Sequence, residues 1–272
     1  MGTGLPVLTS IWISCRERLL FSTALLIACT STAPLTGRKQ LKLVDDVTVI
    51  NNSVASYNSF ISQTRAKGQL ANNTPDGRRV AAIGKRIASA VEKYMIENGM
   101  QERVKYLNWE FNLIKSKDIN AFAMPGGKIA FYTGILPVLK TDAGIAFVMG
   151  HEIGHVIGGH HAEGQSNQQL AGIAAGITNI FMGGAASSLV SDGLSLGLLK
   201  FNRTQEYEAD KYGLIFMAMA GYNPQEGIKA EERMAAISNS GGSDFTSTHP
   251  ASDKRIQALK DFLPEAMKYY RK

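Results

Sequence analysis

The stretch from His151 to His155 has the residue types and spacing of a catalytic metal site. The two histidines are four residues apart, so on a helix their rings lie on the same face. Two neutral imidazoles at this spacing can bind one Zn²⁺ ion. Glu152 follows the first histidine directly, where its carboxylate lies near the metal without binding it and can accept a proton from water. The stretch therefore predicts metal-assisted hydrolysis.

A catalytic zinc ion needs a third protein ligand and one open position. His161 is one candidate, because the chain from His151 onward also fits His-Glu-x-x-His-x-x-Gly-x-x-His, with Gly158 at the glycine position. Glu206 is the other candidate. On a helix it shares a face with Asp210, which could then hydrogen-bond the second nitrogen of a ligating histidine. A charged, solvated helix face is the plain alternative for that pair, so spacing alone leaves the third ligand open.

Helices are expected to carry most of these residues. Apolar positions recurring every three or four residues predict helices over 45–63, a second one ending near 98–99, and then 142–160, 203–220, 224–237 and 251–270. Alternation predicts a strand at 106–114, and Pro125-Gly126-Gly127 predicts a hairpin between 120–124 and 128–132. The small-residue segment 168–200 is interpreted as paired helices. The sequence thus predicts a mainly helical α+β fold.

Several motifs together resemble one family. After the His151–His155 stretch come Asn-Arg-x-x-Glu-Tyr-x-Ala-Asp at 202–210 and Thr-His-Pro at 248–250, and before it Asn-Ala-Phe-Ala-Met-Pro-Gly-Gly at 120–127. In this order, over roughly residues 34–260, the chain resembles the zinc metalloendopeptidases that include HtpX, the CAAX prenyl proteases and the Oma-type proteases. The resemblance is closest to the LoiP-like periplasmic lipoproteins.

This resemblance implies a fold and a set of roles. The fold is the zincin-like (gluzincin) fold, with a small β-sheet or hairpin packed on the active-site helix. It implies one Zn²⁺ per chain and favours Glu206 over His161 as the third ligand. The implied roles are the metal ligands His151, His155 and Glu206, the catalytic residues Glu152 and His249, and the supporting residue Asp210.

Three further site predictions are less specific. His249 would face the substrate and donate a hydrogen bond to the oxyanion. Arg203 would orient Glu206 or Asp210, with an ordinary surface arginine as the equal alternative. An extended peptide substrate would add as a strand beside Asn120, Ala121, Phe122 and Ala123, unless these residues form only a core hairpin.

The amino terminus is interpreted as a targeting signal. Arg16 and Arg18 precede an apolar run at 19–28, which ends at Cys29 in a sequence that resembles a lipobox. The predicted organisation is a signal peptide at 1–28, a lipidated linker at 29–44 with Cys29 as the lipidation site, and a single metallopeptidase domain at 45–272. A simple signal peptide or an uncleaved anchor is the alternative. Cys15 and Cys29 are the only cysteines, so cysteine neither cross-links the body nor binds metal there.

Composition limits the function classes. The chain has 272 residues, 44% of them apolar and 19% charged, which excludes a disordered or multi-span membrane protein. The net charge of +6 is scattered, unlike the basic face of a nucleic-acid-binding protein. We expect a lipid-anchored zinc endopeptidase on the periplasmic side of a bacterial envelope, with the outer membrane favoured, which acts on unfolded or damaged polypeptides. The alternative is a chaperone-like or assembly binding protein whose zinc site is structural or latent.

Overall fold

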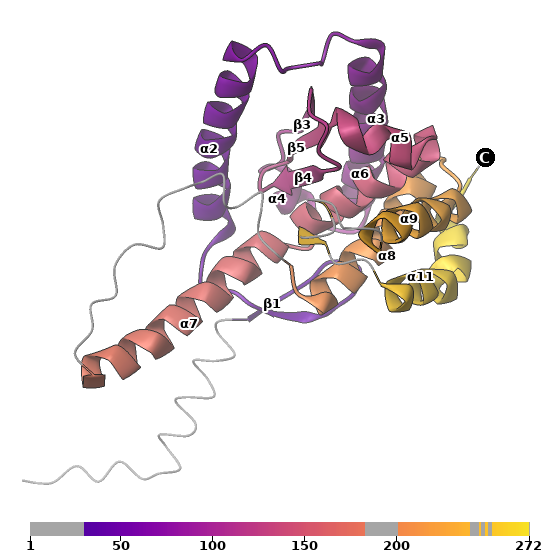
Figure 1. Cartoon of the computed structure of the whole chain (residues 1–272). Helices are drawn as coiled ribbons and strands as arrows, with labels where there is room; N and C mark the ends of the chain where they lie inside the picture. The colour runs from indigo at the N-terminus through magenta and orange to yellow at the C-terminus, as the bar shows by residue number, and fades with distance from the viewer. Residues whose placement is uncertain (1–29, 183–200, 240–244, 246–247, 250–251, 272) are drawn as a thin grey trace, which may run out of the picture.

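The computed structural model describes residues 30–182, 201–239, 245, 248–249 and 252–271 (Figure 1). Its helices are α2 (Asp46–Ala66), α3 (Pro75–Glu97), α4 (Gln101–Val104), α5 (Leu136–Leu139), α6 (Asp142–Ile157), α7 (His160–Met182), α8 (Arg203–Met219), α9 (Pro224–Asn239) and α11 (Asp253–Ala266). Its strands are β1 (Thr30–Thr32), β2 (Lys39–Leu41), β3 (Glu110–Ile114), β4 (Ala121–Met124) and β5 (Lys128–Tyr132). Over these residues, no helix has the length and apolar character needed to span a bilayer. The predicted mainly helical α+β class is confirmed.

Helix α6 lies at the centre of the molecule. Thr141 caps it, because the hydroxyl oxygen of this residue accepts a 3.0 Å hydrogen bond from the backbone N–H of Gly144. Every residue from Gly144 to His155 is buried, since α3, α8, α9 and the sheet pack around the helix. Polar side chains on α6 are therefore enclosed by protein.

Glycines bring α6 and α8 into close contact. A Cβ atom at Gly150 would lie 2.9 Å from the carbonyl oxygen of Gly213, and one at Gly154 would lie 2.7 Å from the Cβ atom of Tyr212. Only glycine permits so close an approach of two helices. Side chains on the facing surfaces of α6 and α8 can consequently reach a common point.

We expect Gly150→Ala to lower the free energy of unfolding by about 1–3 kcal/mol, because the added methyl group forces α6 away from α8. Urea unfolding followed by circular dichroism measures this change. Ala143→Ser is the matched control, since it also adds one atom to α6 but at a half-buried position near the start of the helix. Equal stability of Gly150→Ala and the control would contradict the close crossing.

Among the described residues, β4 is an edge strand of the sheet and lies beside α6. The strand order is β3-β5-β4, with β5 antiparallel to β4 and parallel to β3. In the turn between β4 and β5, Gly126 and Gly127 have φ angles of 84° and 86°, which glycine adopts without strain. The predicted hairpin is confirmed, and β4 contacts α6.

Helices cover both faces of this sheet (Figure 1). On one face, Tyr57 and Ile61 of α2 pack against Phe122 and Met124 of β4. The Tyr57 hydroxyl also donates a 2.8 Å hydrogen bond to the carbonyl oxygen of Ile129. On the other face, α3 and α6 form the main core together with α8, α9 and α11. The sheet thus separates two apolar clusters.

Two predicted elements differ from the structure. The segment 106–114 becomes a strand only at Glu110, because turns follow α4 and the N–H of Asn108 bonds to the carbonyl of Gly126. The helix predicted for 142–160 ends at Ile157, and α7 begins at His160 and runs in a different direction. Gly159, with a φ of 69°, makes the turn between the two helices. Of the predicted paired helices at 168–200, α7 accounts for the part up to Met182, and 183–200 lie outside the described residues.

Residues 30–44, predicted to be a linker, are folded onto the body. β1 and β2 pair antiparallel, and the N–H of Leu43 donates a 2.9 Å hydrogen bond to the Ser166 hydroxyl. Arg38 forms ion pairs with Glu163 and Glu208. Glycine and proline in this stretch indicated a linker, but contacts with residues far along the chain order it. The predicted signal peptide at 1–28 and the lipidation site Cys29 lie outside the described residues.

Candidate metal centre

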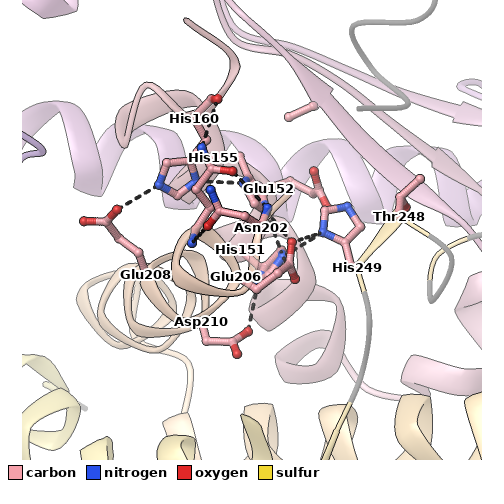
Figure 2. A network of polar contacts seen from close by, with 12 residues as sticks. His151, Glu152, His155, His160, Asn202, Glu206, Glu208, Asp210, Thr248 and His249 are labelled. Atoms are coloured by element: carbon pink, nitrogen blue, oxygen red, sulfur yellow. Dashed lines mark hydrogen bonds and ion pairs between the residues drawn. The ribbon is translucent and has the colours of Figure 1, made fainter. Parts of the chain in front are cut away.

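His151 and His155 lie one turn apart on α6 and point toward α8 (Figure 2). The two residues are only 1% and 0% exposed. Their Nε2 atoms are 3.1 Å apart, and their ring centroids are 4.7 Å apart. The spacing of four residues therefore brings two imidazoles to one point.

Glu206 reaches the same point from the first turn of α8. A capping box begins this helix, since Asn202 and Gln205 each accept a hydrogen bond from the other's backbone N–H through their side chains. The Glu206 carboxylate has one oxygen 3.7 Å from Nε2 of His151 and the other 3.6 Å from Nε2 of His155. The capping box that begins α8 thus fixes the position of the Glu206 side chain.

A fourth donor, His249, comes from the segment between α9 and α11. Its Nδ1 lies 2.9 Å from Oε1 of Glu206 and 3.3 Å from Nε2 of His151 (Figure 2). One donor atom from each of His151, His155, Glu206 and His249 lies within 4.8 Å of the other three. The Phe245 ring stacks on His249, with centroids 4.6 Å apart. Sequence reasoning expected His249 to face substrate, and the structure places it among the donors themselves.

Asp210 fixes the tautomer of His151. Its Oδ1 lies 3.1 Å from Nδ1 of His151, and because a carboxylate can only accept, Nδ1 carries the proton. Burial opposes ionisation of Asp210, but Arg255, which bonds both of its oxygens at 2.5 and 2.7 Å, brings its pKa down to about 2. Burial lowers the pKa of His151, which favours the neutral ring. Nε2 of His151 therefore presents a lone pair to Glu206.

His160 and Glu208 fix the tautomer of His155 in the same way. Nδ1 of His160 lies 2.8 Å from Nδ1 of His155, and its Nε2 lies 3.0 Å from Oε2 of Glu208. Because the carboxylate accepts, a neutral His160 carries its proton on Nε2 and accepts at Nδ1. His155 then donates from Nδ1 and keeps a lone pair on Nε2. Burial and the neighbouring histidines hold the pKa of His155 well below its ordinary value.

These contacts bring electron-pair donors together without a hydrogen between them. The Nε2 atoms of His151 and His155 face each other at 3.1 Å, and the carboxylate of Glu206 faces both. Buried lone pairs are stable in this arrangement only when a cation compensates them. Two imidazoles and one carboxylate form a ligand set of catalytic zinc sites. The donor set therefore fits a divalent metal ion, with His249 facing the fourth position.

Glu152 lies beside the four donors. Its Oε1 is 3.5 Å from Nε2 of His249, and among the described residues this oxygen has no hydrogen-bond partner. Burial raises the pKa of the Glu152 carboxyl to about 7, although the neighbouring His249 lowers it in part. A carboxyl with this pKa can take up and release a proton near neutral pH.

The edge strand β4 borders the centre. Because the N–H of Tyr132 donates to the carbonyl of Asn120, the backbone groups of Ala121 and Ala123 point away from β5. The carbonyl oxygen of Ala123 accepts a 2.9 Å hydrogen bond from Nε2 of His161. Phe122 instead packs toward α2. The predicted docking edge thus lies at the centre, with one of its carbonyl groups bonded to His161.

His161 itself lies away from the four donors. The chain turns at Gly158 and Gly159 and then starts a new helix. His161 therefore does not lie on the helix face that carries His155 and is directed toward β4 instead. Burial lowers the pKa of His161 to about 3. The spacing that made His161 a candidate ligand therefore does not place it at the centre, whereas Glu206 is placed there.

An arginine other than the expected one contacts the carboxylates. Arg203 is exposed at the first turn of α8. Arg255, at the start of α11, lies 3.0 Å from Glu206 and 2.5 Å from Asp210. No role was predicted for Arg255 from the sequence. Its place in the first turn of a helix shortly after His249 was the available signal.

Comparisons with known proteins agree with this geometry. The model of peptidase family M48 matches residues 82–263. The mitochondrial metalloendopeptidase OMA1 of Saccharomyces cerevisiae is 32% identical over 88% of this chain and 70% of its own length. The metalloprotease LoiP of Escherichia coli is 26% identical over 88% of this chain and 95% of its own length. The OMA1 of Schizosaccharomyces pombe is 36% identical, and the matched region spans about half of that protein, 53%.

Proposed function

We propose, on the premise that the chain belongs to peptidase family M48 and is a metalloendopeptidase, that its metal is zinc and that it hydrolyses peptide bonds of unfolded or damaged polypeptides. The family match confirms the resemblance drawn from the motifs. One observation carries the proposal. The lone pairs of His151, His155 and Glu206 converge beside the buried carboxyl of Glu152.

Each residue of the centre has its own role in the proposed reaction. Zinc, when bound by His151, His155 and Glu206, would supply a Lewis acid that activates water and polarises the scissile carbonyl. Glu152 accepts the proton of the attacking water and passes it to the leaving amine, and its buried Oε1 has no other hydrogen-bond partner among the described residues. Asp210 keeps the ring of His151 in the binding tautomer. His249 donates a hydrogen bond to the oxygen of the reacting carbonyl.

The substrate class follows from the edge strand. An extended peptide beside Asn120–Ala123 would be bound mainly through its backbone, and it would have to exchange with His161 at the carbonyl of Ala123. Backbone recognition depends little on side chains and requires a chain segment that can become extended. We therefore assign flexible polypeptides as substrates, with weak sequence preference.

A binding function is the second candidate, and the position of His249 favours it. Four protein donors would close the metal site and leave no position for a substrate. The protein would then be a chaperone-like or assembly factor with a structural or latent zinc site. Glu152 favours the peptidase, because a structural site has no use for a buried carboxyl beside the metal.

We further propose that the protein is anchored by a lipid at Cys29 on the periplasmic side of a bacterial envelope, with the outer membrane favoured. The support is the apolar run at 19–28 that ends at Cys29. Its partners would be flexible polypeptides and, through the anchor, the membrane, with no nucleic acid. Several relatives are named as mitochondrial, so attachment to a mitochondrial membrane is the alternative. Metabolic labelling with an azido fatty acid, compared between wild type and Cys29→Ser, separates a lipidated chain from an unmodified one.

We expect the wild-type protein to cleave an unfolded polypeptide, a chelator to abolish cleavage, and one equivalent of zinc per chain to restore it. The convergence of His151, His155 and Glu206 beside the buried carboxyl of Glu152 is the reason. Gel analysis of reduced, denatured α-lactalbumin measures this, with the native form of the same protein as the control. Zinc bound at one per chain without cleavage would favour the binding function. Cleavage that persists in the chelator would contradict the metal mechanism.

A further inference from the structure

A path of hydrogen bonds leads from the metal centre to the amino-terminal segment. It starts at Nδ1 of His155 and passes to His160 over 2.8 Å, to Glu208 over 3.0 Å and to Nε of Arg38 over 2.7 Å. Figure 2 shows its inner part, with Glu208 and His160 on the side of the centre opposite His249. The path joins α6, α7, α8 and the turn between β1 and β2.

We propose that His160, Glu208 and Arg38 are positioning residues that hold the ring of His155 in the orientation and tautomer needed to bind the metal. This inference rests on the function proposed above. None of the three is one of the four donors. They act only through Nδ1 of His155, and partners of this kind orient metal-binding histidines in many sites.

Arg38 is the residue that fixes the outer end of the path. Its Nε donates to Glu208, and its two terminal nitrogens donate to the two oxygens of Glu163 at 2.7 and 2.8 Å. Glu163 also accepts a 2.8 Å hydrogen bond from the side chain of Gln205. The planar guanidinium thus spans two carboxylates on different helices, which a lysine cannot do with the same geometry. Without it, Glu208 loses its charged partner and keeps only His160 and the Thr36 hydroxyl, so its direction is less restrained.

The two ligating histidines are supported in parallel ways. His151 is held by Asp210, whose partner Arg255 comes from α11 near the carboxyl end. His155 is held through His160 by Glu208, whose partner Arg38 comes from the amino-terminal hairpin. In each case a carboxylate on α8 is fixed by an arginine from one end of the described chain. This parallel argues that Arg38 serves the metal centre and is more than a surface contact.

The test compares zinc affinity among variants of the full chain. We expect Arg38→Ala and Glu208→Ala to raise the zinc dissociation constant by about 10-fold or more, as loss of such outer partners does elsewhere. Arg38→Lys keeps the positive charge but loses the planar guanidinium that spans the two carboxylates. Its zinc dissociation constant should lie between those of wild type and Arg38→Ala. The matched control is Arg79→Ala, which removes a partly exposed arginine paired with Asp142 on the same helix as the ligands.

Competition with a chromophoric chelator gives the affinity, and the visible spectrum of the cobalt-loaded protein reports ligand geometry independently. Thermal melting of the metal-free variants shows that each is folded. Arg38→Ala with the zinc affinity and cobalt spectrum of wild type would overturn the proposal. If Glu208→Ala does not fold, the two Arg38 variants decide alone, because Arg38 is partly exposed. A wild type that binds zinc but cleaves nothing contradicts the proposed function and leaves this comparison intact, whereas a wild type that binds no zinc contradicts both.

Discussion

Glu152→Gln should retain zinc but lose proteolysis, with kcat/KM lower by about 10²- to 10⁴-fold, the range attributed to a general base. Glutamine has nearly the shape of glutamate, so the donors around it stay in place. It cannot accept the proton that Oε1 is placed to take, and this oxygen has no other hydrogen-bond partner among the described residues. Steady-state cleavage of a quenched fluorescent peptide, together with zinc content by mass spectrometry, measures both quantities.

Glu231→Gln is the matched control for this variant. Glu231 is also buried, and burial raises its pKa to about 7, but its carboxyl lies 3.7 Å from Arg255 and is not among the four donors. We expect this variant to keep most of the activity. A Glu152→Gln protein as active as Glu231→Gln would remove Glu152 from the mechanism, and loss of zinc from Glu152→Gln would show that its role is in binding.

The same substitution has a signature in the stability of the metal-free protein. The pKa of Glu152 rises from an ordinary value of 4.5 to about 7 on folding, chiefly through burial. Because the folded state binds this proton more tightly, wild-type stability falls as the pH rises from about 4.5 through about 7. Glutamine carries no such proton. The stability of Glu152→Gln relative to wild type should therefore increase over that range.

Arg255→Met should have the largest effect on stability, a loss of roughly 3–5 kcal/mol, because a buried ion cluster loses its cation. Arg255 is 3% exposed. It contacts Asp210 at 2.5 and 2.7 Å, Glu206 at 3.0 Å and Glu231 at 3.7 Å. Methionine fills much of the space but leaves these carboxylates without a counter-charge. Urea unfolding of the metal-free protein at pH 7 measures the loss.

Lys260→Met is the control, because it removes a positive charge from the same helix. Lys260 pairs with Glu232 at 2.7 Å on the surface, so its loss should change stability by less than about 1 kcal/mol. The pH dependence gives a second check. Arg255 holds the pKa of Asp210 at about 2 against the effect of burial, below its ordinary 3.8. That stabilisation exists above pH 3.8 and is lost toward pH 2, so wild type and Arg255→Met should converge in acid. A difference that is the same at pH 7 and pH 3 would contradict this role.

Local spacing predicted the parts of the centre that lie on single helices. Two histidines one turn apart, and Glu206 with Asp210 one turn apart, share faces whatever the rest of the fold does. The rest depends on contacts between distant segments. Nothing local in Arg38 or Glu208 indicates that the two side chains meet 2.7 Å apart. Hydrophobic alternation predicts strands but not their order, so the parallel pairing of β3 with β5 was also missed.

The boundary between α6 and α7 shows a second limit. The glycines at 158 and 159 interrupt a pattern that otherwise continues as a helix, and a glycine inside a helical pattern can be tolerated or can end it. Here it ends the helix, because Gly159 adopts a positive φ. The direction of His161 follows from this single turn.

If Cys29 carries a lipid, the folded amino-terminal hairpin determines how far the metal centre can lie from the membrane. β1 begins at Thr30, directly after Cys29, and the ion pairs of Arg38 tie the hairpin to α7 and α8. A lipid on Cys29 would therefore hold the body against the bilayer with no slack. A long flexible linker between the lipid and the domain would let the metal centre reach a wide volume of the surrounding compartment. This short, ordered attachment would instead keep the metal centre at a fixed distance from the bilayer. Only chains that come close to the membrane surface would then be cleaved.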